Sequence, residues 1–194
     1  MSDEVYVSSF ARAFLGRAAL IKAKAPNDSP ADEDIIDLVA SGDTEAFGIL
    51  VRRYENFVFT LVRGLVISEE QARDISQEVF LRAYRALRRF ERKSSFKTWL
   101  YRIAYNSSMS HLKRKDDNIE SMQDLNVEKE QENSVPHPAK YLLRRLIDKL
   151  NPELKAVVIF HYYDDLKYEE IAEILDCPLG TVKVRLFRAK HELK

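Results

Sequence analysis

The sequence has little of what disulfide frameworks, membrane spans and turn-rich folds require. The chain of 194 residues contains one cysteine, Cys177, which excludes an intramolecular disulfide and fits a reducing compartment. Only five glycines and six prolines are present, which favours helices over a β fold. No apolar run approaches the roughly 18 residues that span a membrane, and charges interrupt the first 31 residues too often for a signal peptide. We therefore expect a cytoplasmic protein without membrane insertion.

The residues of a catalytic or metal site are missing as well. The four histidines are scattered, and there is no second cysteine, phosphate-binding loop or nucleophile–base pair. We expect no catalytic residues, no metal and no cofactor, and an enzyme is the least favoured class. Cys177 is interpreted as a packed or capping residue.

The chain has no net charge, with 31 basic and 31 acidic residues, but the two signs are separated along it. Between Arg82 and Lys115, eleven Lys and Arg face one acid, Glu91. Between Lys115 and Pro138, seven acids face two lysines. The first block suits a polyanion, and the second predicts an extended, solvated tether.

Helical periodicity and capping signals predict an all-α fold of two small domains joined by a flexible acidic linker. The first domain includes helices over 32–40, from Asp43 to Leu65, from Ser68 to about Arg89, and from Ser94 or Ser95 onward. In the second domain, Asn151-Pro152 provides a cap and a first-turn proline. The predicted parts are an N-terminal extension (1–31), a first domain (32–115), the linker (116–138) and a second domain (139–194).

The C-terminal part has the spacing of a helix-turn-helix. Helices over about 168–175 and from Pro178 onward are separated by Asp176 and Cys177, and small Ala172 allows them to approach closely. Val182, Leu186 and Ala189 form the inner stripe of the last helix, which leaves a basic outer face suited to phosphates and guanine edges. The alternative is a solvated helical hairpin kept soluble by its lysines. Asp176 where glycine is favoured, and Lys167 where Ser or Thr would cap, both depart from the motif.

Two further segments carry a resemblance to a known family. Asp74-Ile75-Ser76-Gln77-Glu78-Val79-Phe80-Leu81-Arg82-Ala83-Tyr84, followed by Phe96-Lys97-Thr98-Trp99-Leu100-Tyr101-Arg102-Ile103-Ala104-Tyr105-Asn106 and Leu112-Lys113-Arg114, resembles region 2 of bacterial sigma factors of the extracytoplasmic-function (ECF) group. Leu166 to Ala172 and Cys177 to Lys183 resemble their region 4. Both segments occur in the family's order, with a variable linker between them.

The resemblance implies a transcription initiation factor that carries RNA polymerase core to promoters and helps to melt them. It implies a helix that binds the coiled coil of the largest polymerase subunit, through Asp74, Gln77, Glu78, Phe80 and Arg82. It implies minus-ten element binding by Ser95, Phe96, Thr98, Trp99, Arg102, Asn106, Lys113 and Arg114. For Phe96 and Trp99, core packing is the alternative to stacking on bases.

For region 4, the resemblance implies docking on the flap of the polymerase β subunit. It also implies minus-thirty-five element binding by Thr181, Lys183, Val184, Arg185, Phe187 and Arg188. An anti-sigma factor is the expected regulator, one that could hold the protein at the inner membrane, in a stress or envelope response. The rival interpretations are a helix-turn-helix regulator that binds operators unaided, and a sigma mimic that sequesters an anti-sigma factor without binding DNA.

Overall fold

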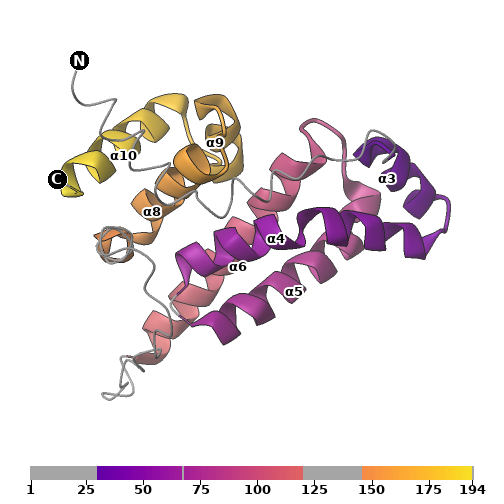
Figure 1. The fold of residues 1–194 in the computed structure, drawn as a ribbon, viewed down its shortest axis with the longest axis horizontal. Coiled ribbons are helices and arrows are strands. Elements are labelled where there is room, and N and C mark those ends of the chain that lie inside the picture. The colour runs from indigo at the N-terminus through magenta and orange to yellow at the C-terminus, as the bar shows by residue number, and fades with distance from the viewer. Residues whose placement is uncertain (1–29, 67, 120–145, 194) are drawn as a thin grey trace, which may run out of the picture.

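The computed structural model describes residues 30–66, 68–119 and 146–193. This part of the chain consists of helices and short connections and contains no β-strand, which confirms the predicted all-α class. Most of the predicted N-terminal extension and acidic linker lies outside the described residues. The helices are coloured along the chain in Figure 1.

The N-terminal domain is built around two long antiparallel helices and the α6 helix that packs across them. Its elements are α3 (Asp32–Ala40), the 3-10 turn η1 (Thr44–Ala46), α4 (Phe47–Leu65), α5 (Glu69–Ala86), the 3-10 turn η2 (Leu87–Arg89) and α6 (Phe96–Ile119).

Side-chain caps fix where these helices begin. The Asp43 carboxylate accepts hydrogen bonds from the amides of Glu45 and Ala46, after Gly42 has ended α3 in a left-handed conformation with φ of 114°. Ser68 accepts from the Gln71 amide at the start of α5, and Ser95 accepts from the Thr98 amide at 3.1 Å before α6. The capping positions predicted from the sequence are confirmed.

The C-terminal domain contains the helix-turn-helix. Its named elements are α8 (Pro152–Val158), a π-helical turn η3 (Ile159–Tyr163), α9 (Tyr168–Leu175) and α10 (Leu179–Glu192). Asn151 caps α8 through the Leu154 amide at 2.9 Å, with proline in the first turn. Asp176 adopts the left-handed conformation that the short turn requires, with φ of 50°. Lys167 provides no side-chain cap, but the Glu170 carboxylate accepts its amide at 2.9 Å, which satisfies the other half of a capping box.

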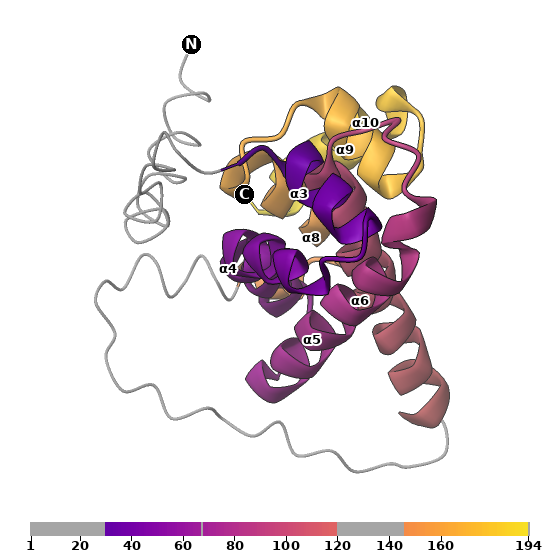
Figure 2. The same ribbon diagram turned by 90° about the vertical axis from the view of Figure 1, so that its right-hand side faces the viewer.

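The two domains pack against each other, which the sequence did not predict. In Figures 1 and 2 the C-terminal helices lie against one side of the α4–α6 bundle. Helix α6 contacts α9, and α4 contacts α8, so that the buried apolar residues of both domains form one continuous cluster. Gly64 of α4 permits this approach, because a Cβ atom there would lie 2.5 Å from Cδ1 of Ile159.

Two phenylalanines on helices that the sequence assigns to DNA binding provide a test of this packing. Phe96 is 1% exposed among the rings of Tyr54, Phe90 and Trp99, whereas Phe187 is 71% exposed. We expect Phe96→Ala to lower the free energy of unfolding by about 3–5 kcal/mol, and Phe187→Ala to change it by less than about 0.5 kcal/mol. Urea unfolding followed by circular dichroism measures both. Equal losses would contradict the assignment of Phe96 to the core.

Candidate nucleic-acid interface

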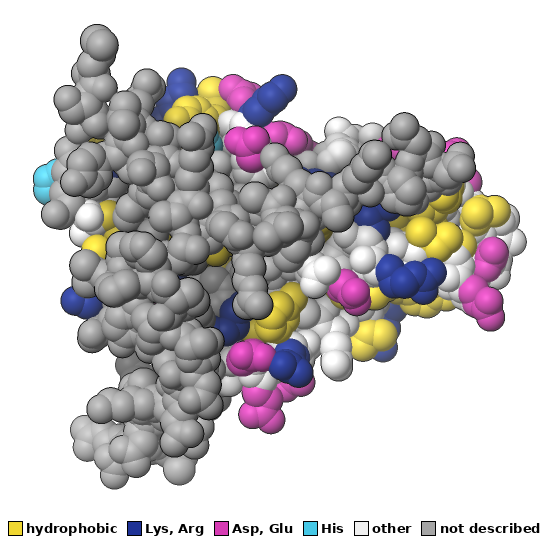
Figure 3. Space-filling view, in the orientation of Figure 1, with side chains coloured by type: hydrophobic (Ala, Val, Ile, Leu, Met, Phe, Trp, Pro, Cys, Tyr) yellow, Lys and Arg dark blue, Asp and Glu magenta, His cyan; other side chains and the backbone are white. Residues whose placement is uncertain are grey.

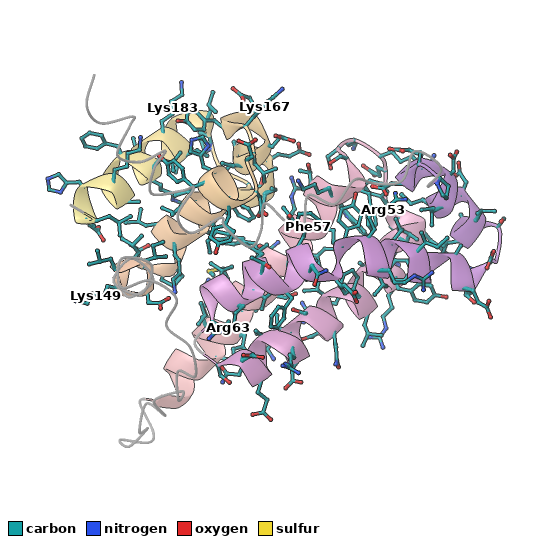
Figure 4. All side chains as sticks on the ribbon, viewed as in Figure 1. Arg53, Phe57, Arg63, Lys149, Lys167 and Lys183 are labelled. Atoms are coloured by element: carbon teal, nitrogen blue, oxygen red, sulfur yellow. The ribbon has the colours of Figure 1, made fainter. Side chains whose placement is uncertain are left out.

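The outer face of α10 combines cations with exposed apolar side chains. Val182, Leu186 and Ala189 are buried against the rest of the domain, as their spacing predicts. Lys183 and Arg188 are exposed on the other side, together with Val184 and Phe187, which are 49% and 71% exposed. Figure 4 shows Lys183 at the outer edge of the domain. The predicted residue Thr181 is half-buried in the first turn of the same helix.

Arg185 differs from the other predicted cations of α10 in being held by a partner. Its Nη2 donates to Oε2 of Glu153 at 2.5 Å, and its Nη1 contacts Sγ of Cys177 at 3.9 Å. The side chain of Arg185 is only 20% exposed. Arg185 therefore ties α10 to α8, and Cys177 packs beside it, in keeping with the interpretation of Cys177 as a packed residue.

Three residues predicted for the minus-ten element belong largely to the interior. Phe96 and Thr98 are buried, and Trp99 is half-buried with its ring 4.9 Å from that of Phe90. The Thr98 hydroxyl also pairs with the Ser95 hydroxyl at 2.8 Å. These side chains hold the start of α6 and the preceding loop in place rather than forming the surface.

The other predicted residues of α6 lie along its outside. Asn106, Lys113 and Arg114 are exposed, and so is Ser95 at the N-cap. Because each α-helical residue advances 1.5 Å, Asn106 and Lys113 lie about 10 Å apart along the helix. Arg102 differs from these residues, because its guanidinium donates from Nε and Nη2 to the Glu173 carbonyl of α9, at 3.1 and 2.5 Å.

The loop before α6 is anchored to α3. Arg92 adopts a left-handed conformation with φ of 55°, and its guanidinium forms an ion pair with Asp37. The hydrogen bond from Arg92 to Asp37, together with the charge of Asp37, raises the pKa of Arg92. This exposed contact links the loop before α6 to α3.

The predicted polymerase-binding stripe is exposed on α5. Asp74, Gln77, Glu78 and Arg82 all lie at the surface, and Nη2 of Arg82 pairs with Glu78 at 2.5 Å, four residues away. Phe80 instead is half-buried against the core. On the face shown in Figure 3, acidic, basic and apolar side chains alternate over the N-terminal helices.

One exposed apolar residue on the same helix face was not singled out from the sequence. Leu81 is 55% exposed, and it lies seven residues after Asp74 and four after Gln77, in the middle of the polar face. The signal was present in the sequence, because an apolar residue at that helical position interrupts an otherwise polar face. An exposed leucine at this position adds an apolar contact to a face that is otherwise polar.

The part of the chain that the structure describes contains no cluster of three or more His, Cys, Asp or Glu that could hold a metal ion. None of its helices is long and apolar enough to cross a membrane.

A two-domain helical protein with a helix-turn-helix and cationic helix faces belongs to the class of DNA-binding proteins. The family models "Sigma-70 region 2" and "Sigma-70, region 4" match residues 50–117 and 140–193. The ECF RNA polymerase sigma-E factor of Escherichia coli K12 is 36% identical over 176 residues, which cover 84% of this chain and 92% of the relative. The RNA polymerase sigma-H factor of Pseudomonas aeruginosa PAO1 is 32% identical over 176 residues, covering 84% and 91%.

Solved structures share the fold. The structure of CnrH in complex with the cytosolic domain of CnrY matches with a TM-score of 0.64 and 24% identity, over 84% of this chain and 95% of that chain. The Bartonella quintana sigma factor RpoE in complex with the anti-sigma factor NepR matches with a TM-score of 0.62 and 20% identity, over 76% and 93%.

The chain belongs to the sigma-70 family, in its ECF group. It is a transcription initiation factor that directs RNA polymerase to promoters.

The two arginines of α10 allow the packed and exposed sides of this helix to be separated experimentally. We expect Arg185→Ala to lower the free energy of unfolding by about 1 kcal/mol, because it removes a partly exposed ion pair between α10 and α8. Arg188→Ala is the matched control and should leave the unfolding midpoint unchanged, because Arg188 is exposed and has no hydrogen bond or ion pair with a described residue. Thermal unfolding measures both, and an equal effect would rule out this division.

Proposed function

We propose that this chain acts without chemistry of its own, by holding two DNA-reading surfaces on RNA polymerase core. The observation that carries the proposal is the order of the two matched regions, each of which presents an exposed helix face of suitable charge. The polymerase supplies the catalysis and the scaffold. Such a protein acts in the cytoplasm, where bacterial DNA and polymerase are found.

The minus-ten element is assigned to the outer side of α6 and its N-terminal loop. Lys113 and Arg114 provide cations for phosphates, and Asn106 provides an amide that both donates and accepts at a base edge. Ser95 is exposed at the end of the loop that precedes α6. The packed rings of Phe90, Phe96 and Trp99 support this loop. Promoter melting then depends on binding unpaired bases more strongly than the duplex.

The minus-thirty-five element is assigned to the outer face of α10 in a major groove. Lys183 and Arg188 supply phosphate or guanine contacts, and Val184 and Phe187 supply apolar contacts such as those that recognise a thymine methyl group. Arg185 is left out of this reading surface, because Glu153 occupies its guanidinium.

We further propose an anti-sigma factor as the regulator, in a stress or envelope response. The support is the family to which the chain belongs, and the two solved relatives named above are themselves complexes with such partners or with a partner's cytosolic domain. An anti-sigma factor anchored in the inner membrane would hold the inactive protein there.

Run-off transcription with purified core polymerase on a genomic promoter library tests the proposal. Transcripts that depend on this protein would identify both the function and the promoter. The absence of transcripts with a core that is active with another sigma factor would contradict the proposal, and specific operator binding without core would favour the unaided regulator.

Neutralising the outer face of α10 tests the assignment of the minus-thirty-five contacts. We expect Lys183→Ala and Arg188→Ala each to weaken promoter binding by the holoenzyme, and to reduce the slope of log K against log salt by about 0.9 for each phosphate that is no longer neutralised. Lys149→Ala is the control, because exposed Lys149 lies on the opposite side of the domain from Lys183 in Figure 4. Equal slopes for the Lys149 and Lys183 variants would refute the assignment.

The exposed leucine on α5 tests the polymerase contact. We expect Leu81→Asp to weaken the affinity for core polymerase by about tenfold or more, because it places a charge in the middle of a docking face. Leu38→Asp is matched in chemistry and exposure, since Leu38 is 46% exposed on α3, and it should bind core normally. Fluorescence anisotropy of labelled protein titrated with core measures both affinities. A similar weakening in the two variants would show that the effect is not specific to the stripe.

A further inference from the structure

The interface between the two domains is closely packed. Phe160 of η3 is fully buried, with its ring centroid 5.9 Å from that of Tyr101 and 6.4 Å from that of Tyr105, both on α6. Ile159 lies against Gly64 of α4. Aromatic packing of this kind excludes water, so the closed arrangement is a defined state rather than a loose encounter.

In the closed arrangement, the C-terminal domain contacts a residue that the resemblance assigns to DNA binding. Arg102 donates two hydrogen bonds to the Glu173 carbonyl, and Glu173 belongs to α9, the first helix of the helix-turn-helix. The same contact places α9 beside α6. An arginine held in this way has its Nε and Nη2 donors occupied and its side chain fixed on α9, so fewer donors are left for a promoter phosphate.

Closure is also incompatible with reading two promoter elements at once, a point that rests on the proposed function. Elements centred about 25 base pairs apart are separated by about 85 Å along B-form DNA, at 3.4 Å per base pair. Helices α6 and α9 touch in the described structure, and α10 packs on α9. The domains must therefore separate before both reading surfaces can engage a promoter.

A carboxylic acid lies at this interface. Asp164 follows η3 and interacts with Lys97 and Tyr101 of α6. The Nζ atom of Lys97 lies 5.5 Å from the centroid of the Tyr101 ring and 5.7 Å from that of Phe57, the α4 side chain labelled in Figure 4. Oδ2 of Asp164 and the Tyr101 hydroxyl are both buried, and neither completes a hydrogen bond with a described residue.

The surroundings of Asp164 favour its neutral form. Burial raises the pKa of Asp164 to about 7, and the charge of Lys97 and the nearby Tyr101 hydroxyl oppose this shift only in part. The other titratable neighbours are Tyr54 of α4, which interacts with Tyr101, and His161 and Asp165 along the chain. Once the domains separate, Asp164 returns to water and to the usual pKa of about 4.

We propose that the closed arrangement is a resting state latched by protonated Asp164, and that separation of the domains releases one proton from this carboxyl group and frees Arg102. The direction of the pH dependence follows from the linkage between proton binding at Asp164 and separation of the domains. The closed state binds the proton more tightly, so its advantage is complete below about pH 4 and is lost as the pH rises towards 7. The ratio of open to closed molecules should therefore rise about tenfold between pH 6 and pH 8.

Energy transfer between two dyes on the full chain measures this ratio without polymerase. The dyes are attached through Glu70→Cys on α5 and Glu192→Cys on α10, both exposed positions, in a Cys177→Ser background. In the labelled protein that retains Asp164, we expect the fraction of open molecules to rise as the pH increases from 6 to 8. Asp164→Asn mimics the protonated acid and should stay closed at both pH values.

Two further variants keep the test decisive. Asp165→Asn is the matched control, because Asp165 is exposed and Asn also accepts its left-handed φ of 54°, and it should retain the full pH response. Gly64→Gln should open the domains at pH 6, because its Cβ would overlap Ile159 while glutamine is a better helix former than glycine.

A pH response that persists in Asp164→Asn, or no response in the parent protein, would overturn the latch. An unchanged distance in Gly64→Gln would overturn the closed packing. None of these outcomes depends on promoter activity, so they remain separate from a failure of run-off transcription.

Discussion

Helix α6 packs against the N-terminal bundle and against the C-terminal domain at the same time, and this double packing determines most of the structure. One part of its circumference, with Phe96, Leu100 and Ala104, is buried in the N-terminal bundle, and Tyr101 and Tyr105 pack against Phe160 of the other domain. Only the remaining side is left for solvent. This is why a segment rich in aromatic residues and cations exposes only a narrow side, and why its aromatic residues mainly pack in the interior.

The same constraint explains what the sequence could and could not predict. Local signals were sufficient for the elements, because a cap such as Asn151 or Ser68 acts within one turn of its own helix. The bounds of α3 were predicted for the same reason, and Asp176, counted as a departure from the motif, adopts the left-handed conformation that glycine usually provides. Periodicity also showed that α10 has an inner stripe, but it could not show that Glu153, 32 residues earlier, would bind Arg185. Contacts between helices that are far apart in the sequence produce no periodic pattern from which they could be predicted.

The packing between the domains is the largest feature that lay beyond sequence reasoning. An acidic linker predicts a tether, and a tether is compatible with any distance that its length allows. Gly64 is a local sign of close approach, yet a lone glycine in a helix of the first domain does not identify Ile159 as its neighbour. Tyr101 and Tyr105, four residues apart, likewise form an apolar pair whose partner only the fold reveals.

In the proposed function, closed packing and promoter recognition use the same surface of α6, so the two compete. The energy that buries Phe160 and satisfies Arg102 must be recovered from polymerase and DNA when the domains separate. The proposed docking of α5 on polymerase suits this task, because the α5 stripe lies outside the interface between the domains and stays exposed while the molecule is closed. The first domain can then bind core before the second is released. Since a ligand shifts an equilibrium only by its differential affinity for the two states, region 4 must bind the polymerase or the promoter more strongly than it binds α6.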